Sequence, residues 1–227
     1  MNSLSAIQRS GDKMKKVDLL IFDFDGTLAD TGADLVTSVN YTLAAMRLNT
    51  KSSQEILTFV GDGVTKLIER SLGEDHRDRL EEAMSIFSGH YEKHLLDQTV
   101  LYPHIEDVLK YFNHKMKVIL TNKRHHLVLA IARGLHIDRY FMEIVGADST
   151  PFQKPDQRVV EYLLEKYNVA PQKAIIIGDG VNDIAVAKNA GILSCAYLNG
   201  LGNKETLIQM EADFYCENIL EVNTLFQ

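Results

Sequence analysis

The stretch Val17-Asp18-Leu19-Leu20-Ile21-Phe22-Asp23-Phe24-Asp25-Gly26-Thr27-Leu28-Ala29-Asp30 decides the expected fold. It opens with a short and almost uninterrupted apolar run, Val17 to Phe22, and then turns acidic. A run of this length without polar alternation is typical of a central strand that is covered on both faces. The sequence therefore predicts a buried strand with Asp23 and Asp25 at its carboxyl end.

The same arrangement of an apolar run followed by polar residues returns further along the chain. The predicted strands are Met116–Leu120 before Thr121, Lys173–Ile177 before Gly178 and, with weaker patterns, Glu143–Val145 and Ile192–Tyr197. Segments with helical periodicity separate them, namely Ile105–Phe112, His126–Leu135, Gln157–Tyr167 and Asp183–Ala190. This alternation predicts an α/β fold with a Rossmann-like, doubly wound parallel sheet.

One long segment breaks the alternation and predicts a second domain. Residues 34–96 are rich in helix formers, carry helical apolar spacing at Leu35, Val39, Leu43 and Met46, and contain no convincing strand. We interpret them as an inserted all-helical cap, with residues 17–33 and 97–227 forming the core. Residues 1–16 lack the apolar stretch of a signal peptide and are expected to be a loose leader.

Composition excludes several classes of function. The 227 residues carry a formal net charge of -7, which opposes nucleic-acid binding through a basic face. The apolar runs are strand-sized, so no membrane span is expected, and the predicted location is cytoplasmic. The two cysteines, Cys195 and Cys216, are too few for a disulfide framework and are expected to be reduced and buried. The pattern leaves monomer and homodimer equally open.

The spacing of Asp23 and Asp25 indicates a metal site. Side chains two residues apart point in the same direction if strand geometry persists, and two unpaired carboxylates there would repel. A Mg²⁺ ion resolves the repulsion, because it prefers oxygen ligands. Backbone N–H groups of the turn at Gly26 and Thr27 are expected to bind a phosphate. The alternative is a strand end capped by an Asx turn.

The segment that begins at Asp23 resembles the signature of the haloacid dehalogenase-like phosphatases, which reads Asp-x-Asp-Gly-Thr. The family's three later motifs also have counterparts in order, at Thr121-Asn122-Lys123, Lys154-Pro155 and Gly178-Asp179-Gly180-Val181-Asn182-Asp183. The resemblance covers nearly all of the chain after Lys16, with the helical insertion in the position of the family's first cap class. Gln157 replaces a proline that the family often has, which puts the rigidity of that loop in doubt.

The resemblance implies a role for each matched residue. Asp23 resembles the nucleophile that attacks phosphorus and also binds Mg²⁺, and Asp25 resembles the general acid and base. The implied metal ligands are the Asp23 side chain, the Asp25 backbone carbonyl, the Asp179 side chain and, directly or through water, Asp183. The implied contacts to the transferred phosphoryl group are Thr121, Asn122, Lys123 and the charge-neutralising Lys154.

The cap gives a narrower but weaker indication of substrate. Residues 61–70 resemble the substrate-facing loop of phosphoglycolate phosphatases, in which Arg70 or Lys66 would bind a second anionic group. The alternative is that both are solvated helix charges balanced by nearby carboxylates. We therefore predict a Mg²⁺-dependent phosphatase for a small phosphorylated metabolite, 2-phosphoglycolate being favoured.

Three other functions remain to be weighed. A sugar phosphomutase of the same superfamily would use the same aspartyl phosphate, but such enzymes commonly have valine where this chain has Thr27. A catalytically silent regulator that binds a phosphorylated ligand or a protein would be free to lose the acidic residues. A dinucleotide-binding dehydrogenase is disfavoured because Asp183 occupies the last glycine position of Gly-x-Gly-x-x-Gly.

Overall fold

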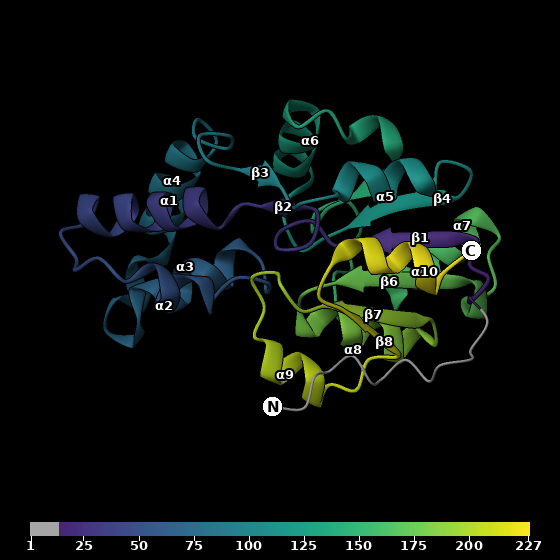
Figure 1. The fold of residues 1–227 in the computed structure, drawn as a ribbon. Helices are drawn as coiled ribbons and strands as arrows, with labels where there is room; N and C mark the ends of the chain where they lie inside the picture. The colour runs from purple at the N-terminus through teal and green to yellow at the C-terminus, as the bar shows by residue number, and fades with distance from the viewer. Residues whose placement is uncertain (1–13) are drawn as a thin grey trace, which may run out of the picture.

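The computed structural model describes residues 14–227, in which a parallel sheet and a separate group of helices lie at opposite ends of the molecule (Figure 1). The sheet has six strands in the order β5-β4-β1-β6-β7-β8, and every neighbouring pair is parallel. The strands are β1 (Leu19–Phe22), β4 (Met116–Leu120), β5 (Glu143–Val145), β6 (Ala174–Gly178), β7 (Leu193–Tyr197) and β8 (Phe214–Cys216). The predicted α/β fold with a parallel sheet is confirmed.

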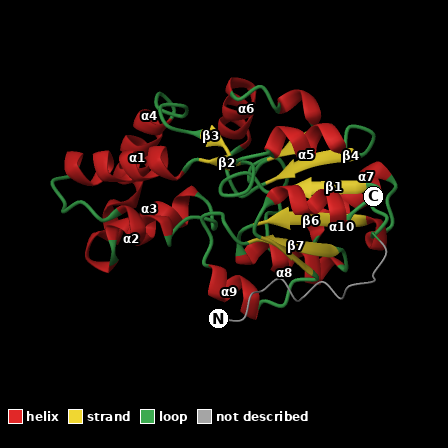
Figure 2. Cartoon of the chain, viewed as in Figure 1, coloured by secondary structure: helices red, strands yellow, loops and turns green. Residues whose placement is uncertain are grey.

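Helices cover both faces of this sheet, as Figure 2 shows. They are α5 (Ile105–Tyr111), α6 (His125–Gly134), α7 (Arg158–Tyr167), α8 (Val181–Ala190), α9 (Lys204–Gln209) and α10 (Val222–Leu225), with the short 3₁₀ turns η3 (Asp138–Tyr140), η4 (Pro171–Lys173) and η5 (Ile219–Glu221). Along β1, Leu20 and Phe22 pack in one hydrophobic cluster with residues of α5 and α6. Leu19 and Ile21 pack in the other cluster with residues of α7 and α8. The central strand is therefore buried on both faces, as its unbroken apolar run predicts.

The second group of helices forms the cap. It contains α1 (Gly32–Ala45), α2 (Ser53–Leu57), α3 (Val64–Leu72), η2 (Glu74–Arg79) and α4 (Leu80–Tyr91). The four apolar residues whose spacing predicts the first cap helix are all buried in the cap's own hydrophobic cluster. Two short antiparallel strands, β2 (Ala29–Asp30) and β3 (Val100–Leu101), lie where the chain leaves and re-enters the core (Figure 1).

The sequence patterns located five of the six sheet strands and missed β8. That strand is only three residues long and lies at the sheet edge, where a short run carries little periodicity. Most of the predicted leader, residues 1–13, lies outside the described residues. Lys15, however, exchanges backbone hydrogen bonds with Leu225 and Gln227 and is attached to the core. No helix in the described part of the chain is long and apolar enough to cross a membrane.

Candidate active site

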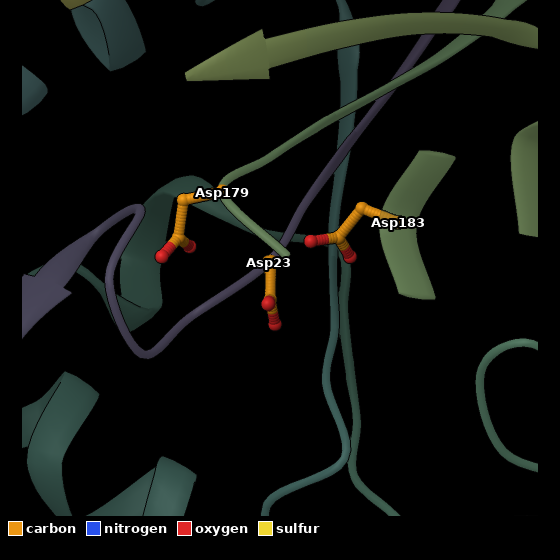
Figure 3. A group of neighbouring side chains, drawn as sticks. All are labelled: Asp23, Asp179 and Asp183. Carbon is orange, nitrogen blue, oxygen red and sulfur yellow. The ribbon is translucent and has the colours of Figure 1, made fainter. Parts of the chain in front are cut away.

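Three carboxylates converge where β1 and β6 end (Figure 3). Asp23 follows β1, Asp179 follows β6, and Asp183 lies in the first turn of α8. One oxygen from each carboxylate lies within 4.8 Å of the others. Parallel strands present their carboxyl ends at one edge of the sheet, so residues more than 150 positions apart meet there. Asp25, the other carboxylate of the first motif, instead pairs with Lys123.

Burial makes it unfavourable for all the carboxylates of this cluster to be ionised at once. Asp179 and Asp183 are 3% and 1% exposed. Burial, followed by the charge of Asp23, raises the pKa of Asp179 to about 7, and the same causes raise the pKa of Asp183. A set of close, desolvated carboxylate oxygens fits a hard divalent cation, which would relieve both the repulsion and the desolvation. The residues present therefore fit a Mg²⁺ site.

A buried lysine neutralises one side of the cluster. The Lys154 ammonium lies 2.9 Å from Asp23 Oδ1 and 2.5 Å from Asp183 Oδ1. Burial opposes the charged form of Lys154, but the attraction of Asp183 and Asp23 outweighs it and raises the pKa of the lysine. Asp183 also accepts a hydrogen bond from the backbone N–H of Gly180 at 2.9 Å. Asp183 thus orients Lys154 and closes the first turn of α8 as well as facing Asp23.

The turn after Asp25 shapes the site by holding Asp179. A Cβ atom on Gly26 would lie 2.0 Å from Asp179 Oδ2, and the φ of Gly26 is +85°, so only glycine fits. The Thr27 hydroxyl donates to Asp179 Oδ1 at 2.6 Å. The backbone amides of Leu201 and Gly202 donate to Asp179 Oδ2. Asp179 is therefore fixed by three donors before any ligand binds.

The amides of this turn, which are predicted to bind phosphate, donate within the turn in this structure. The backbone N–H of Gly26 donates to the Ala29 carbonyl and that of Thr27 to the Phe24 carbonyl. Both donors are used within the turn, because its tight geometry closes these hydrogen bonds itself. Gly26 and Thr27 consequently serve Asp179 in this structure.

Asp25 belongs to a second buried ion pair. Its Oδ1 accepts from the Thr31 hydroxyl at 2.7 Å and from the Lys123 ammonium at 2.9 Å. Lys123 also donates to the hydroxyl of Tyr91, at 2.6 Å. Tyr91 is the last residue of cap helix α4 and is 1% exposed. The sequence patterns missed Tyr91, because at helical spacing from Phe87 it is indistinguishable from an ordinary core aromatic residue.

Two asparagines join the core to the cap loop between α2 and α3. The Asn122 side chain donates to the carbonyls of Gly61 and Lys154, each at 3.0 Å. The Asn182 side chain donates to the Gly61 carbonyl at 3.2 Å and to Asp62 Oδ1 at 2.7 Å. Both side-chain N–H groups of Asn122 are thus occupied by backbone carbonyls, and its expected contact to phosphate stays a prediction. The cap-facing role of Asn182 was not predicted.

The two cap cations expected to bind substrate lie elsewhere. Arg70 pairs with Asp62 Oδ2 at 2.5 Å, and Lys66 pairs with Glu69 Oε2 at 2.7 Å. Neither residue lines the cavity between core and cap. Lys66 thus pairs with a carboxylate one helical turn away on α3, and Arg70 pairs with a carboxylate in the loop before α3.

The cavity between core and cap has a volume of about 60 Å³ and is lined in part by Asp23 and Asp25. Its polar lining includes Asp23, Asp25, Thr121 and Lys123 from the core and Tyr91 from the cap. Its remaining walls are mainly apolar and include Leu35, Val60, Val64, Leu67, Phe87 and Leu127. Residues from both domains therefore enclose one space next to the predicted nucleophile.

Comparison with known proteins agrees with this geometry. The sequence model of the haloacid dehalogenase-like hydrolases matches residues 20–197. A phosphoglycolate phosphatase of Colwellia psychrerythraea is 33% identical over 207 residues, covering 87% of this chain and 91% of that protein. One from Vibrio cholerae is 29% identical over 215 residues, covering 91% and 95%.

Solved structures show the same fold. The crystal structure of a predicted phosphoglycolate phosphatase from Haemophilus somnus superimposes with a TM-score of 0.87 at 26% identity, covering 92% of this chain and 97% of that one. A haloacid dehalogenase-like family hydrolase from Streptococcus pneumoniae gives 0.85 at 27% identity, covering 93% and 99%. The core and the helical cap are thus present together in these relatives.

Proposed function

Because the chain belongs to the haloacid dehalogenase-like hydrolase family and is a phosphoric monoester hydrolase, we propose that it hydrolyses 2-phosphoglycolate with Mg²⁺ through an aspartyl phosphate on Asp23. The observation that carries this proposal is the position of Asp23. Its carboxylate lies beside the Lys154 ammonium, within the cluster of three carboxylates, and lines the cavity between core and cap. The names of the relatives support the choice of substrate.

In the first step, Asp23 attacks phosphorus and the bond from phosphorus to the leaving oxygen breaks. Asp25 gives its proton to that oxygen, so the alcohol leaves uncharged. Lys154 stays within hydrogen-bonding distance of Asp23 and balances the negative charge that gathers there. Thr121 lines the same cavity, and its hydroxyl is proposed to donate to a phosphoryl oxygen.

In the second step, Asp25 takes a proton from water as the water oxygen attacks phosphorus. The bond between Asp23 and phosphorus breaks, which releases inorganic phosphate and restores both aspartates. The proposed Mg²⁺ ligands are the side chains of Asp23 and Asp179 and the Asp25 carbonyl, with Asp183 as a further carboxylate. When bound, the ion would supply positive charge that neutralises the phosphoryl oxygens.

The test is phosphate release from a panel of 2-phosphoglycolate, sugar phosphates, nucleotides and pyrophosphate, with Mg²⁺ and with EDTA. Release that is led by 2-phosphoglycolate, needs the metal and disappears in Asp23→Asn would support the whole proposal. Faster release from another compound would refute 2-phosphoglycolate as the substrate but leave the proposed reaction mechanism intact. No release from any compound would favour a mutase or a silent binding protein.

We place the enzyme in the cytoplasm, where its two free, buried thiols would stay reduced.

A further inference from the structure

Lys123 has donor capacity that its protein contacts do not use. An ammonium group has three N–H donors. In the described part of the chain, Asp25 and the Tyr91 hydroxyl accept two of them. Lys123 is 8% exposed and lines the cavity beside Asp23. One N–H of a buried cation is thus left for whatever occupies that cavity.

Tyr91 adds a second donor beside it. Its hydroxyl oxygen accepts from Lys123, and among residues 14–227 its own proton has no acceptor. Burial raises the pKa of Tyr91 to about 12, so the hydroxyl keeps its proton at neutral pH. Tyr91 also lines the cavity. A Lys123 N–H and the Tyr91 O–H can therefore meet the two oxygens of one carboxylate.

The position of this pair relative to the reaction fixes the part of the substrate that it meets. In the proposed reaction, Asp25 gives a proton to the oxygen that leaves with the alcohol. Lys123 lies 2.9 Å from Asp25 Oδ1. An anionic group attached to the first carbon beyond the leaving oxygen would therefore come close to Lys123. In the proposed reaction, the transferred phosphoryl group lies instead at Asp23, whose cationic partner is Lys154 at 2.9 Å.

The rest of the cavity lining narrows the substrate class. Its apolar walls offer no partners to the hydroxyl groups of a sugar, and an unpaired buried hydroxyl is unfavourable. Lys123 and Arg124 are the cationic residues that line the cavity, and Arg124 is exposed at the start of α6. A short leaving group with one carboxylate and no further hydroxyl groups fits this lining best.

We propose that Lys123 and Tyr91 form the site that recognises the carboxylate of the leaving group, so that the enzyme selects short phosphorylated α-hydroxy acids. This inference rests on the proposed phosphatase function and moves Lys123 from the phosphoryl group, where the motif alone placed it, to the leaving group. In this proposal the Lys123–Tyr91 pair, rather than the cap cations Arg70 and Lys66, binds the second anionic group of the substrate.

The first experiment compares kcat/KM for 2-phosphoglycolate with kcat/KM for ethyl phosphate, which has a methyl group in place of the carboxylate. Lys123→Met should lower this ratio about 100-fold relative to wild type, as expected for losing a hydrogen bond between charged groups. Tyr91→Phe should lower it about 5-fold, since a neutral donor is lost. Lys110→Met, on the exposed face of α5, is the matched control and should leave the ratio unchanged.

The second experiment measures binding without turnover. In the Asp23→Asn background, adding Lys123→Met should weaken calorimetric binding of 2-phosphoglycolate about 100-fold and of inorganic phosphate less than about 3-fold. Equal losses for both ligands would return Lys123 to the phosphoryl group and overturn the inference. The conservative Lys123→Arg, which keeps the charge, should retain most of the preference for the acid.

The outcomes separate this inference from the proposed function. A wild-type protein that releases phosphate from no ester would remove the phosphatase function itself. A wild-type protein that hydrolyses esters but does not prefer 2-phosphoglycolate to ethyl phosphate would overturn only the carboxylate site. A preference that survives in Lys123→Met would overturn it as well, because both esters would then depend on Lys123 only through Asp25.

Discussion

The two buried lysines of the active site make a useful comparison. Lys154 lies between Asp23 and Asp183, and all three residues belong to the core. Lys123 lies between Asp25 of the core and Tyr91 of the cap. The first arrangement is complete without the cap, whereas the second exists only while α4 is packed over the core. In the proposed reaction, the core alone would therefore prepare the chemistry at phosphorus, and the cap would contribute recognition of the leaving group.

The two lysines also differ in how much negative charge surrounds them. Lys154 touches two of the three clustered carboxylates, and Asp179 remains without a cation in the described structure. Lys123 has one carboxylate and one neutral hydroxyl. The core site therefore holds an excess of negative charge that a divalent cation can use. The charges of Lys123 and Asp25 balance, and the site at Lys123 becomes positive once Asp25 carries the proton that the proposed first step requires.

The largest expected effect comes from removing Asp23, the proposed nucleophile. Asp23→Asn keeps the size of the side chain but cannot form the aspartyl phosphate, so kcat for any ester should fall at least about 10⁴-fold. Steady-state phosphate release with Mg²⁺ measures it, and thermal unfolding checks that the variant is folded. Residual turnover within about tenfold of wild type would mean that the core does not perform the chemistry in the way proposed.

A large effect on stability is expected at Asp179, the carboxylate without a lysine. Its pKa is about 7 in the folded protein and 3.8 in the reference state, so the folded state binds the proton more tightly. Ionisation therefore destabilises the metal-free fold progressively as pH rises from about 4 to 7, by about 4 kcal/mol when complete. Asp179→Asn should remove this penalty, because an amide can accept from Leu201 and Gly202 and donate to Thr27.

Urea unfolding in EDTA at pH 8 and at pH 5 measures this difference. The variant should be more stable than wild type at pH 8, and the gain should shrink at pH 5. Added Mg²⁺ should reduce the gain by stabilising only the wild type. Asp107→Asn, an exposed carboxylate on α5, serves as the control for loss of one charge. A variant that is less stable at pH 8 would show that hydrogen bonds to the carboxylate outweigh its desolvation.

The same contrast between core and cap explains what could be predicted from the sequence. The strands were predictable because β1, β4 and β6 are buried on both faces and carry apolar runs, interrupted in β4 by Lys117 alone, that end in polar residues. Asp23 and Asp179 could be brought together because parallel strands end at one edge of the sheet. These inferences need only the local pattern and one topological rule.

The contacts of the cap could not be predicted in this way. Tyr91 has the spacing of a core residue, and only the packing of α4 beside the loop after β4 brings its hydroxyl to Lys123. Arg70 and Lys66 carry the right charge, but their pairing with Asp62 and Glu69 depends on rotamers that periodicity does not specify. Side-chain partners at the surface of a helix are thus the part of a site least determined by sequence pattern.

A smaller effect is expected where the cap loop is fastened to the core. Asn182→Ala removes the hydrogen bonds to Gly61 and Asp62 without touching the carboxylate cluster. KM for 2-phosphoglycolate should rise about 3- to 10-fold with kcat nearly unchanged, because about 1 kcal/mol of cap docking is lost. Steady-state kinetics measures the split. A fall in kcat with constant KM would place Asn182 in the chemistry of the core instead.

The smallest effect is expected at Arg70, whose side chain is 40% exposed and pairs with Asp62. An ion pair this accessible to water contributes less than about 1 kcal/mol, and Arg70 does not line the cavity. Arg70→Met should therefore change kcat/KM for 2-phosphoglycolate less than about 3-fold, against about 100-fold for Lys123→Met measured in the same assay.

If instead Arg70→Met caused the larger loss and Lys123→Met the smaller, the cap would have to move so that Arg70 leaves Asp62 for the substrate. The second anion contact would then lie on α3, and the division between a core that acts on phosphorus and a Lys123–Tyr91 pair that recognises the acid would fail.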